Sequence, residues 1–336
     1  MTPTIYEVAA LAGVSPATVS RVLNGVAVSP AYADKVREAA DTLNFRPNRT
    51  ARSLRRRSSE VIALIIPDIE NPFFTALARA VEDRALAAGL SVVLCNSDEQ
   101  PSKEARYLEV AVSEQMAGVI LAPASSETDL TALLNRKTPV VAVDRSSHHV
   151  VDTVVMDNES GGRRATTALY EQGFTRVACI TGPRDVETAR RRAAGWRSVF
   201  TDRSRRANPD NHIRYTNYRV DGGRQAMAEL MRMRRPPDAV FVANNLMSVG
   251  ALQHLFEIGQ PPPQVGLASL GELPFPTWQT QAVTVIPWPA RQLGVEATDL
   301  LLARIRGDDS PARTVVANSE GESSGRDAEI DAASSV

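Results

Sequence analysis

The sequence predicts two kinds of structure in one chain. A small all-α head with a helix-turn-helix is followed by an α/β body of two parallel-sheet subdomains. Three observations support this prediction. Capped helical segments fill residues 4–43, the balance of charge changes sign after residue 59, and short apolar strands alternate with helices from Val61 onward. The 336 residues are enough for two or three domains, each with its own core.

Two short helices joined by a tight turn are predicted over Thr4–Gly25. The first helix carries apolar side chains at helical spacing, at Ile5, Val8, Ala9 and Ala12. Gly13 can supply the positive φ of the turn, Ser15 is a good N-cap, and Pro16 suits the first helical position. The second helix runs to Leu23. Such a pair is typical of a helix-turn-helix that presents its second helix to a DNA major groove, although an αα-hairpin inside a larger helical domain would share these features.

A third helix is predicted over Pro30–Leu43, with Ser29 as its cap, and it closes a small three-helix core. An arginine-rich strip follows up to residue 57, in which Asn48 can cap a short helix that ends near Leu54. Repulsion between its arginines leaves this strip unfolded until a polyanion binds. Leu54 is its exposed hydrophobe, either an ordinary linker leucine or a wedge for a minor-groove base step.

The net charge of −1 conceals an asymmetry along the chain. Residues 1–59 hold nine Lys or Arg against four Asp or Glu, a net charge of +5, and the remaining residues carry a net charge of −6. A basic segment of capped helices on an acidic body is typical of a nucleic-acid-binding module joined to another domain. A solvated basic tail would have the same charge but no capped helices.

The body alternates strands with helices. Strands are predicted over Val61–Ile66, Ser91–Cys95, Val119–Ala122, Val140–Val143, Val154–Met156, Val177–Thr181, Ala239–Val242 and Val265–Ser269. Helices are predicted over Phe73–Ala88, Ser102–Glu114, Ser160–Gln172, Glu187–Thr201, Gly222–Met233, Met247–Ile258 and Ala290–Arg306. Short strands that are apolar on both faces indicate parallel sheets covered by helices on both sides. Their number is too high for one compact sheet, so two subdomains are expected.

A ligand of such a fold binds at the carboxyl ends of the strands, between the subdomains. The polar and aromatic candidates at these positions are Asp68, Asn71, Phe73, Phe74, Asp144, Arg145, Arg192, Tyr218, Asn244, Asn245 and Trp288. Aromatic faces mixed with carboxylate, guanidinium and amide groups suit a sugar, whose hydroxyls need polar partners while its ring stacks. Each Asp or Asn also has a structural alternative, because such residues commonly cap the following helix.

Residues 4–57 carry a family resemblance, in VAALAGVSPATVSRVLNG and then VSPAYADKVREAADTLNFRPNRTARSL. The head resembles the DNA-binding head and hinge of the LacI/GalR family of bacterial transcription regulators. The resemblance implies a homodimer, or a tetramer, that binds a near-palindromic operator, with hinge helices that fold only on DNA. The DNA-contacting positions it implies are Thr4, Tyr6, Ser15, Pro16, Ala17, Thr18, Ser20, Arg21 and Asn24 in the head, and Asn48, Arg49, Ala51, Arg52, Leu54 and Arg55 in the hinge.

Pro16 and Ala17 stand at the two positions that, in the family, choose the operator sequence. Neither side chain can form hydrogen bonds, so direct base recognition is expected from Arg21 on a guanine and from apolar contacts to thymine methyl groups.

The resemblance extends more loosely over residues 61–310, through IPDIENPFF, MDNESGG, RRAAGW, ANNLMSVGAL and LLARIRG. It implies a body like that of periplasmic sugar-binding proteins, with effector contacts at Asp144, Arg192, Tyr218 and Asn244 and an aromatic wall at Phe73 and Phe74. Two positions depart from the family pattern. Gly271 stands where an effector-binding aspartate is usual, with Glu272 as the candidate substitute, and Asn245 replaces another aspartate. The loss of that first aspartate argues against a plain hexose or pentose.

The expected boundaries are residues 1–46 for the head, 47–59 for the hinge, 60–317 for the effector-binding and dimerisation body, and 318–336 for a disordered tail without the family's final strand. Effector-binding candidates are Asp68, Asn71, Phe73, Phe74, Asp144, Arg192, Tyr218, Asn244, Glu272 and Trp288. A sugar or sugar derivative is the expected effector, with a nucleoside or purine as the alternative.

Other classes of protein fit the sequence less well. A solute-binding receptor of similar body would have a signal peptide and no basic head, and common enzyme motifs such as HExxH, the P-loop and G-x-S-x-G are absent. No cofactor or metal is expected. Cys95 and Cys179 lie in separate apolar runs and are expected to be buried thiols. Without a transmembrane run or a leader, a cytoplasmic, nucleoid-associated regulator is expected, most simply a repressor.

Overall fold

The computed structural model describes residues 3–23, 26–45, 59–203, 208–273, 282–317 and 324–325. The chain divides into two compact units, Met1–Ser59 and Glu60–Val336, which we call the head and the body. Each unit has its own hydrophobic core, as a chain of this length allows.

The head consists of α1 (Ile5–Ala12), α2 (Pro16–Leu23) and α3 (Pro30–Thr42). Val8, Val19 and Val36, one from each helix, are completely buried at its centre, as the helical spacing predicts. The turn after α1 is made by Gly13 at φ 63°, and the Ser15 hydroxyl accepts a hydrogen bond from the Thr18 amide at 3.2 Å. These features confirm the predicted helix-turn-helix.

One predicted cap in the head is wrong. Ser29 occupies the N-cap position of α3, but its side chain makes no capping hydrogen bond, whereas Ser15, which also precedes a proline, does cap α2. The capping box of α1 was not foreseen. Thr4 accepts from the Glu7 amide, and Glu7 in turn accepts from the Thr4 amide at 2.6 Å.

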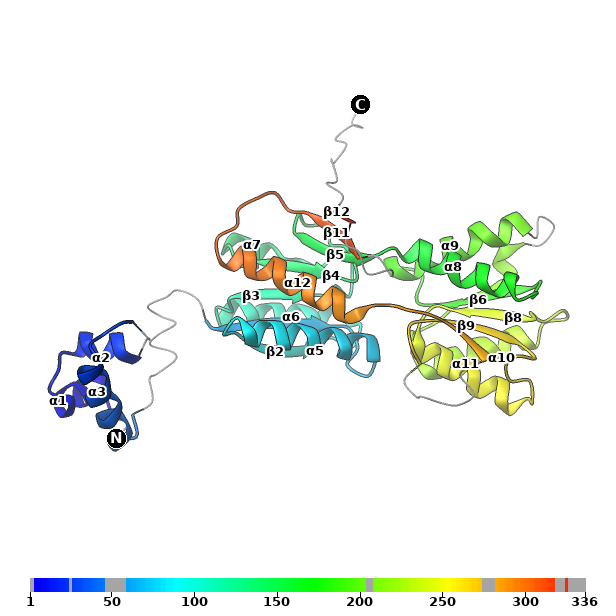
Figure 1. Cartoon of the computed structure of the whole chain (residues 1–336). Helices are drawn as coiled ribbons and strands as arrows, with labels where there is room; N and C mark the ends of the chain where they lie inside the picture. Colours follow the sequence, from blue (N-terminus) through cyan, green and yellow to red (C-terminus); the bar gives the residue numbers. More distant parts are fainter. Residues whose placement is uncertain are drawn as a thin grey trace, which may run out of the picture. The chain divides into compact units, whose positions relative to one another are not determined.

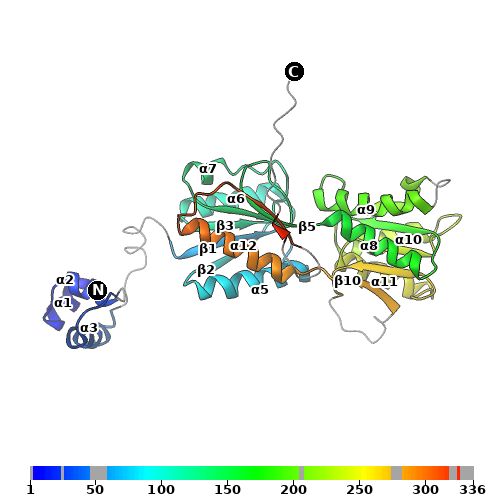
Figure 2. The same cartoon turned by 45° about the horizontal axis from the view of Figure 1, so that its top comes forward.

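The body contains two sheets, as predicted, in two lobes that are separate in both views (Figures 1 and 2). The larger sheet has the order β12-β11-β5-β4-β3-β1-β2 and the smaller has the order β10-β9-β8-β6-β7. The strands of the larger sheet are β1 (Val61–Ile66), β2 (Ser91–Asn96), β3 (Gly118–Leu121), β4 (Val140–Val143), β5 (Asp152–Met156), β11 (Thr314–Ala317) and β12 (Ser324–Gly325). Those of the smaller sheet are β6 (Val177–Thr181), β7 (Ile213–Tyr215), β8 (Ala239–Val242), β9 (Gly266–Leu270) and β10 (Val283–Ile286). Every pair is parallel except β11 with β12.

Helices cover both faces of each sheet, because the central strands are buried on both sides. On the larger sheet, α5 (Pro72–Ala87) and α12 (Ala290–Ile305) pack together on one face, and α6 (Pro101–Ser113) and α7 (Thr131–Asn135) cover the other. On the smaller sheet, α8 (Asn158–Glu171) pairs with α9 (Glu187–Arg203), and α10 (Val220–Met231) pairs with α11 (Asn245–Glu257). A short 3₁₀ helix, η1 (Pro209–His212), precedes β7.

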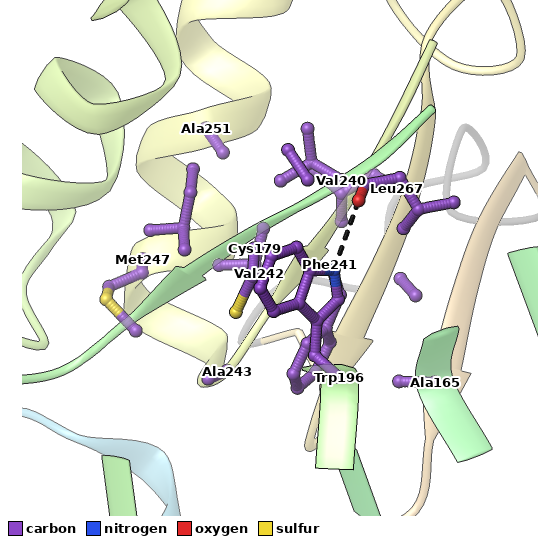
Figure 3. Packing of buried hydrophobic residues seen from close by; sticks show 14 of the residues in the cluster. Ala165, Cys179, Trp196, Val240, Phe241, Val242, Ala243, Met247, Ala251 and Leu267 are labelled. Atoms are coloured by element: carbon purple, nitrogen blue, oxygen red, sulfur yellow. Dashed lines mark hydrogen bonds between the residues drawn. The ribbon is translucent and has the colours of Figure 1, made fainter. Parts of the chain in front are cut away.

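The core of the smaller lobe is centred on Trp196 of α9, which is completely buried against the sheet (Figure 3). Its indole N–H donates to the Val177 carbonyl oxygen at 3.1 Å, which satisfies the single polar atom that so large an apolar side chain brings into a core. The Cys179 thiol lies in the same core, and burial raises its pKa. Both cysteines are buried and free, as expected.

The structure adds short strands that the sequence analysis missed. These are β7, β10 and β11, which are brief and only partly apolar, and β12, a two-residue strand. Ser324–Gly325 pairs antiparallel with β11, so the expectation of a tail without a final strand is wrong there. The other residues of the predicted tail lie outside the described part. The helix bounds agree with the prediction to within two residues in nearly every case, as expected for positions where caps fray.

Candidate functional site

The surface of the head offers few free polar groups on its second helix. Ala17 and Arg21 are exposed, whereas Pro16, Thr18 and Ser20 are half-buried. The Ser15 hydroxyl is also within 2.9 Å of the Thr18 hydroxyl, so both side chains already have a partner inside the head. Arg21 is therefore the exposed cation of α2, which agrees with its expected role in base recognition.

The first helix adds Thr4 and Tyr6 to the same predicted interface. Tyr6 is 71% exposed, which is unusual for an aromatic side chain without a partner to contact. Thr4 is exposed as well, and its hydroxyl takes part in the capping box. The remaining predicted DNA contacts lie outside the described residues. They are Asn24, Asn48, Arg49, Ala51, Arg52, Leu54 and Arg55.

A cavity of about 420 Å³ lies between the two sheets of the body, at the carboxyl ends of their strands. All ten predicted effector-binding residues line this cavity, which we call the body cavity. They are Asp68, Asn71, Phe73, Phe74, Asp144, Arg192, Tyr218, Asn244, Glu272 and Trp288. The strands of a parallel sheet end at one edge, which is why residues as far apart in the sequence as Asp68 and Trp288 line the same cavity.

Asp144 follows β4 and is buried beside two arginines. Its carboxylate lies 3.6 Å from Nε of Arg145, and its Oδ1 has no hydrogen-bond partner among the described residues. Burial raises the pKa of Asp144, and the charges of Arg192 and Arg145 oppose that rise only in part. Arg145 itself forms a bidentate ion pair with Glu99, at 2.6 and 2.7 Å. The Arg145 charge is thus compensated inside the protein, while Asp144 keeps an acceptor without a partner.

Arg192 lies on α9 and is fixed by two of its three nitrogens. Nε donates to the Asn158 side-chain oxygen at 2.7 Å, and Nη1 donates to the Ala243 carbonyl oxygen at 2.8 Å. Its guanidinium carbon lies 5.5 Å from the ring centroid of Trp288, within the range of a cation–π contact. The Trp288 indole nitrogen is buried and has no acceptor among the described residues. This corner of the cavity therefore presents donors to a ligand.

Tyr218 and Asn244 form a connected network on the smaller lobe. The Tyr218 hydroxyl is 2.9 Å from the Thr188 hydroxyl, and burial raises the pKa of Tyr218, so the phenol stays neutral. The Asn244 amide nitrogen donates to the Tyr218 carbonyl oxygen at 2.9 Å, while its side-chain oxygen caps α11 through the Met247 amide at 2.8 Å. Asn244 thus takes the capping role that the sequence left open, and its side chain has few atoms left for a ligand.

The wall contributed by the larger lobe combines a carboxylate with two aromatic rings. Asp68 accepts the Glu70 amide at 2.9 Å, and burial raises the pKa of Asp68. Asn71 caps α5 through the Phe73 amide at 3.0 Å. The rings of Phe73 and Phe74 meet edge to face, with centroids 5.0 Å apart. The predicted aromatic wall is therefore present.

Gly271 follows β9 at φ 88°, a conformation that strains any residue with a side chain. The nearest atom to a Cβ built at this position is Cβ of Trp288, at 3.9 Å, so the space beside it is open. Glu272 lines the cavity and is exposed.

Several lining residues escaped the sequence analysis. They are Pro72, Ala76, Glu99, Thr188, Asn217, Arg219, Leu270, Pro289, Ala290 and Arg291. Thr188, Arg219 and Arg291 lie within a residue or two of a helix start, so the rule that helices begin at the carboxyl ends of strands could have found them. Glu99 is in a loop whose position only the folded sheet determines. Among the described residues, no group of His, Cys, Asp or Glu could hold a metal ion.

Comparison with known proteins gives the family. Residues 4–48 match the model described as bacterial regulatory proteins of the lacI family, and residues 59–330 match periplasmic binding proteins and the sugar-binding domain of the LacI family. The chain belongs to the LacI family. The two matches together include the three helices of the head, with its exposed Arg21, and every residue that lines the body cavity.

Three relatives extend the comparison over nearly the full length. The ribose operon repressor of Halalkalibacterium halodurans is 34% identical over 304 residues, which cover 90% of each chain. The transcriptional repressor PurR of Aliivibrio salmonicida is 28% identical, covering 90% of this chain and 92% of its own. The structure of a lac repressor dimer bound to operator and the anti-inducer ONPF superposes with a TM-score of 0.83 at 24% identity, covering 95% and 97% of the two chains.

This LacI-family chain is therefore a DNA-binding repressor that responds to a small molecule, and it is not an enzyme. The head carries the DNA-binding fold and the body carries the fold that binds the small molecule. None of the helices in the described part is long and apolar enough to cross a membrane.

Proposed function

We propose that this repressor binds a near-palindromic operator as a homodimer, and that a sugar-like molecule bound in the body cavity controls its affinity for the operator. One observation supports the effector-binding part of this proposal: all ten predicted effector-binding residues line a single cavity of about 420 Å³. A volume of this size suits a monosaccharide or a nucleobase rather than a polymer. The similarity to a ribose operon repressor favours the sugar.

The body couples the ligand to the DNA through the two lobes. Asp144 and Phe74 come from the larger lobe, and Arg192 and Tyr218 come from the smaller, so a ligand that contacts both sets favours one opening angle. In a dimer, that angle sets the spacing of the two heads. The spacing decides whether the hinge at residues 47–59 can fold in the minor groove.

In the head, the proposed base contacts centre on Arg21, with Thr4, Tyr6, Ser15, Pro16, Ala17, Thr18, Ser20 and Asn24 around it. The hinge residues Asn48, Arg49, Ala51, Arg52 and Arg55 would contact the backbone, with Leu54 as the wedge at the operator centre. The net charge of +5 over residues 1–59 supports this assignment, and we place the protein with the nucleoid in the cytoplasm.

A purine or nucleoside is the second candidate effector. The similarity to PurR favours it, as does the pair of phenylalanine rings, which could stack on a flat base. The polar set around Asp144 and Arg192 favours the sugar, because it alternates acceptors with donors as vicinal hydroxyls require.

The experiment is a selection of random duplexes on the full chain, run with and without a metabolite panel of sugars, sugar acids, polyols and nucleosides. We expect a two-fold-symmetric sequence whose affinity falls steeply with salt, and a change of that affinity with one class of metabolite. Leu54→Ala should weaken operator binding and leave non-specific binding nearly unchanged. A monomer by sedimentation, or no preference for any symmetric duplex, would refute the proposal.

A further inference from the structure

The smaller lobe has a second cavity, of about 420 Å³, at the amino ends of its strands. Arg176 stands directly before β6, and His212 stands directly before β7. Arg234 and Arg235 belong to the loop between α10 and β8. Because these strands are parallel, their amino ends lie at the edge of the sheet opposite to the body cavity. We call this second site the distal cavity.

The distal cavity is lined by positive charge. Three of its lining residues are arginines, and none of the described residues that line it is an Asp or Glu. Nε of Arg176 donates to the Pro236 carbonyl oxygen at 3.1 Å, which holds this guanidinium beside the segment that carries Arg234 and Arg235. The set therefore gathers at one place, although it comes from two segments about 60 residues apart.

Only a part of this charge is compensated within the described residues. Nη1 of Arg176 lies 3.5 Å from Oδ2 of Asp238, which also accepts hydrogen bonds from Thr175. Arg234 and Arg235 are exposed, and no acid of the described part lies at ion-pair distance from either of them. Two neighbouring guanidinium groups without a counter-charge favour an anion between them.

His212 reports the same positive environment from the next strand. Its Nδ1 is buried and has no hydrogen-bond partner among the described residues. Burial and the positive charges of Arg214 and Arg176 lower the pKa of His212, so its imidazole is neutral at pH 7. The acids of the neighbouring elements are engaged elsewhere, because Asp210 accepts from Arg197 and Glu229 accepts from Arg214.

The size and chemistry of the distal cavity select among anions. Phe200 and Met233 add apolar surface, and the rings of Phe200 and His212 lie with their centroids 5.5 Å apart. A cavity of this volume has room for an organic molecule in addition to its charged group. A phosphate monoester brings up to two negative charges and three acceptor oxygens, which match two arginines better than one carboxylate does.

We infer that the distal cavity binds a phosphate monoester of a small organic molecule, with its phosphoryl oxygens on Arg234 and Arg235 and its organic part against Met233 and the His212 ring. This site lies apart from the body cavity. The inference therefore goes beyond the proposed function and does not depend on which molecule occupies the body cavity.

The test compares phosphate monoesters with their neutral parents and with the bare ion. Ribose 5-phosphate, glucose 6-phosphate and adenosine monophosphate are titrated calorimetrically into the full chain beside ribose, glucose, adenosine and inorganic phosphate, at physiological salt. We expect at least one monoester to bind about tenfold or more tightly than both its parent and inorganic phosphate, because a hydrogen bond to a charged group is worth at least that factor. Salt at this concentration screens weak binding to exposed charges elsewhere.

A double variant assigns the binding to the distal cavity. Arg234→Gln with Arg235→Gln removes two exposed charges, so folding should be undisturbed, and we expect the monoester to bind at least about tenfold more weakly. The matched control is Arg232→Gln with Arg306→Gln, which removes the same charge from exposed positions outside the cavity and should leave the affinity unchanged.

His212 supplies an independent readout. A phosphoryl group beside the arginines offsets their charge, so saturation with the monoester should raise the pKa of the His212 imidazole in a nuclear magnetic resonance titration. His212→Gln assigns the signal, and His254, which does not line the distal cavity, is the internal reference.

The inference is overturned if no monoester binds, if inorganic phosphate or the neutral parent binds as tightly, or if the double variant keeps the parent affinity. An unchanged His212 pKa at saturation would overturn it as well, because the ligand would then occupy another site. None of these results bears on the proposed function, which fails separately if the full chain selects no symmetric duplex.

Discussion

Three residues that line the body cavity have a left-handed backbone although they are not glycine. Glu99, Asp144 and Tyr218 have φ values of 57°, 66° and 61°. This conformation costs roughly 1–2 kcal/mol for a residue with a side chain, so the surrounding fold must hold it in place. Such strain gathers at binding sites, where it aims side chains that an extended backbone would turn away. No sequence pattern predicts this strain, because none of the three residue types requires a left-handed backbone.

Asp144→Asn should reveal the cost of the buried carboxylate. Burial raises the pKa of Asp144, so the folded chain binds the proton more tightly than the unfolded chain. The stability of the parent protein therefore falls as pH rises from the unfolded-state pKa through the raised one, and is level above it. The asparagine variant lacks this fall, and its stability relative to the parent should rise with pH over that window. Denaturant unfolding at several pH values measures the difference, and a difference independent of pH would contradict the assignment.

Arg192→Ala should abolish the response of operator affinity to the effector. It removes the guanidinium that faces the ligand and leaves the Ala243 carbonyl and the Asn158 oxygen without their donors, at a cost of about 1–3 kcal/mol in unfolding free energy. Operator affinity of the effector-free protein should stay unchanged. Fluorescence anisotropy with a labelled operator checks this, and a loss of that affinity would mark Arg192 as structural.

Among the elements, α8 and α9 approach so closely that neither can carry a side chain at the contact. A Cβ on Gly162 would lie 2.2 Å from the Arg192 carbonyl oxygen, and a Cβ on Gly195 would lie 2.0 Å from the Glu159 carbonyl oxygen. Each helix thus contributes a glycine that faces the backbone of the other. This close contact holds Arg192, which lies on α9, in its position beside the cavity. The pair α10 and α11 repeats the arrangement through Gly223 and Gly250.

Gly162→Ala should therefore force α8 and α9 apart. The obstacle is backbone, which cannot rotate away, so we expect a loss of about 1–3 kcal/mol in unfolding free energy together with weaker effector binding. Thermal unfolding and ligand titration check the two effects. The control is Arg163→Ala, one residue along on the exposed side of the same helix, which should change stability by less than about 0.5 kcal/mol.

At the scale of the whole molecule, the body is two lobes joined across a cavity, and few polar contacts cross between them. The Ser146 amide of the larger lobe donates to the Glu187 carboxylate of the smaller lobe at 3.0 Å. Arg219 and Glu70 form a longer contact across the same gap, at 3.7 Å. Because these links are few, ligand contacts of a few kcal/mol are large enough to shift the balance between opening angles.

Glu187→Gln tests the shorter of these two contacts, the hydrogen bond from the Ser146 amide to the Glu187 carboxylate. Partial burial raises the pKa of Glu187, but the hydrogen bonds from Ser146 and Arg191 outweigh it and leave the pKa lowered. A lowered folded-state pKa contributes stability above the unfolded-state pKa, and that stability is lost as pH falls through the folded one. The variant should therefore be less stable than the parent at neutral pH, by about 1 kcal/mol, and the gap should close on acidification. Urea unfolding at neutral and acidic pH measures it, and a gap that widened in acid would contradict the pKa direction.

The sequence by itself determined the helix-turn-helix, the strands of both sheets that are apolar throughout, and ten of the residues that line the body cavity. Caps, spacing and apolar runs are local properties, and the carboxyl edge of a parallel sheet follows from them. Only the tertiary structure decided that Asn244 serves as a cap, that Glu99 neutralises Arg145, and that the Arg192 guanidinium lies over the Trp288 ring. Each of these depends on which atoms face one another across elements far apart in the chain, and that choice is made by packing rather than by any stretch of sequence.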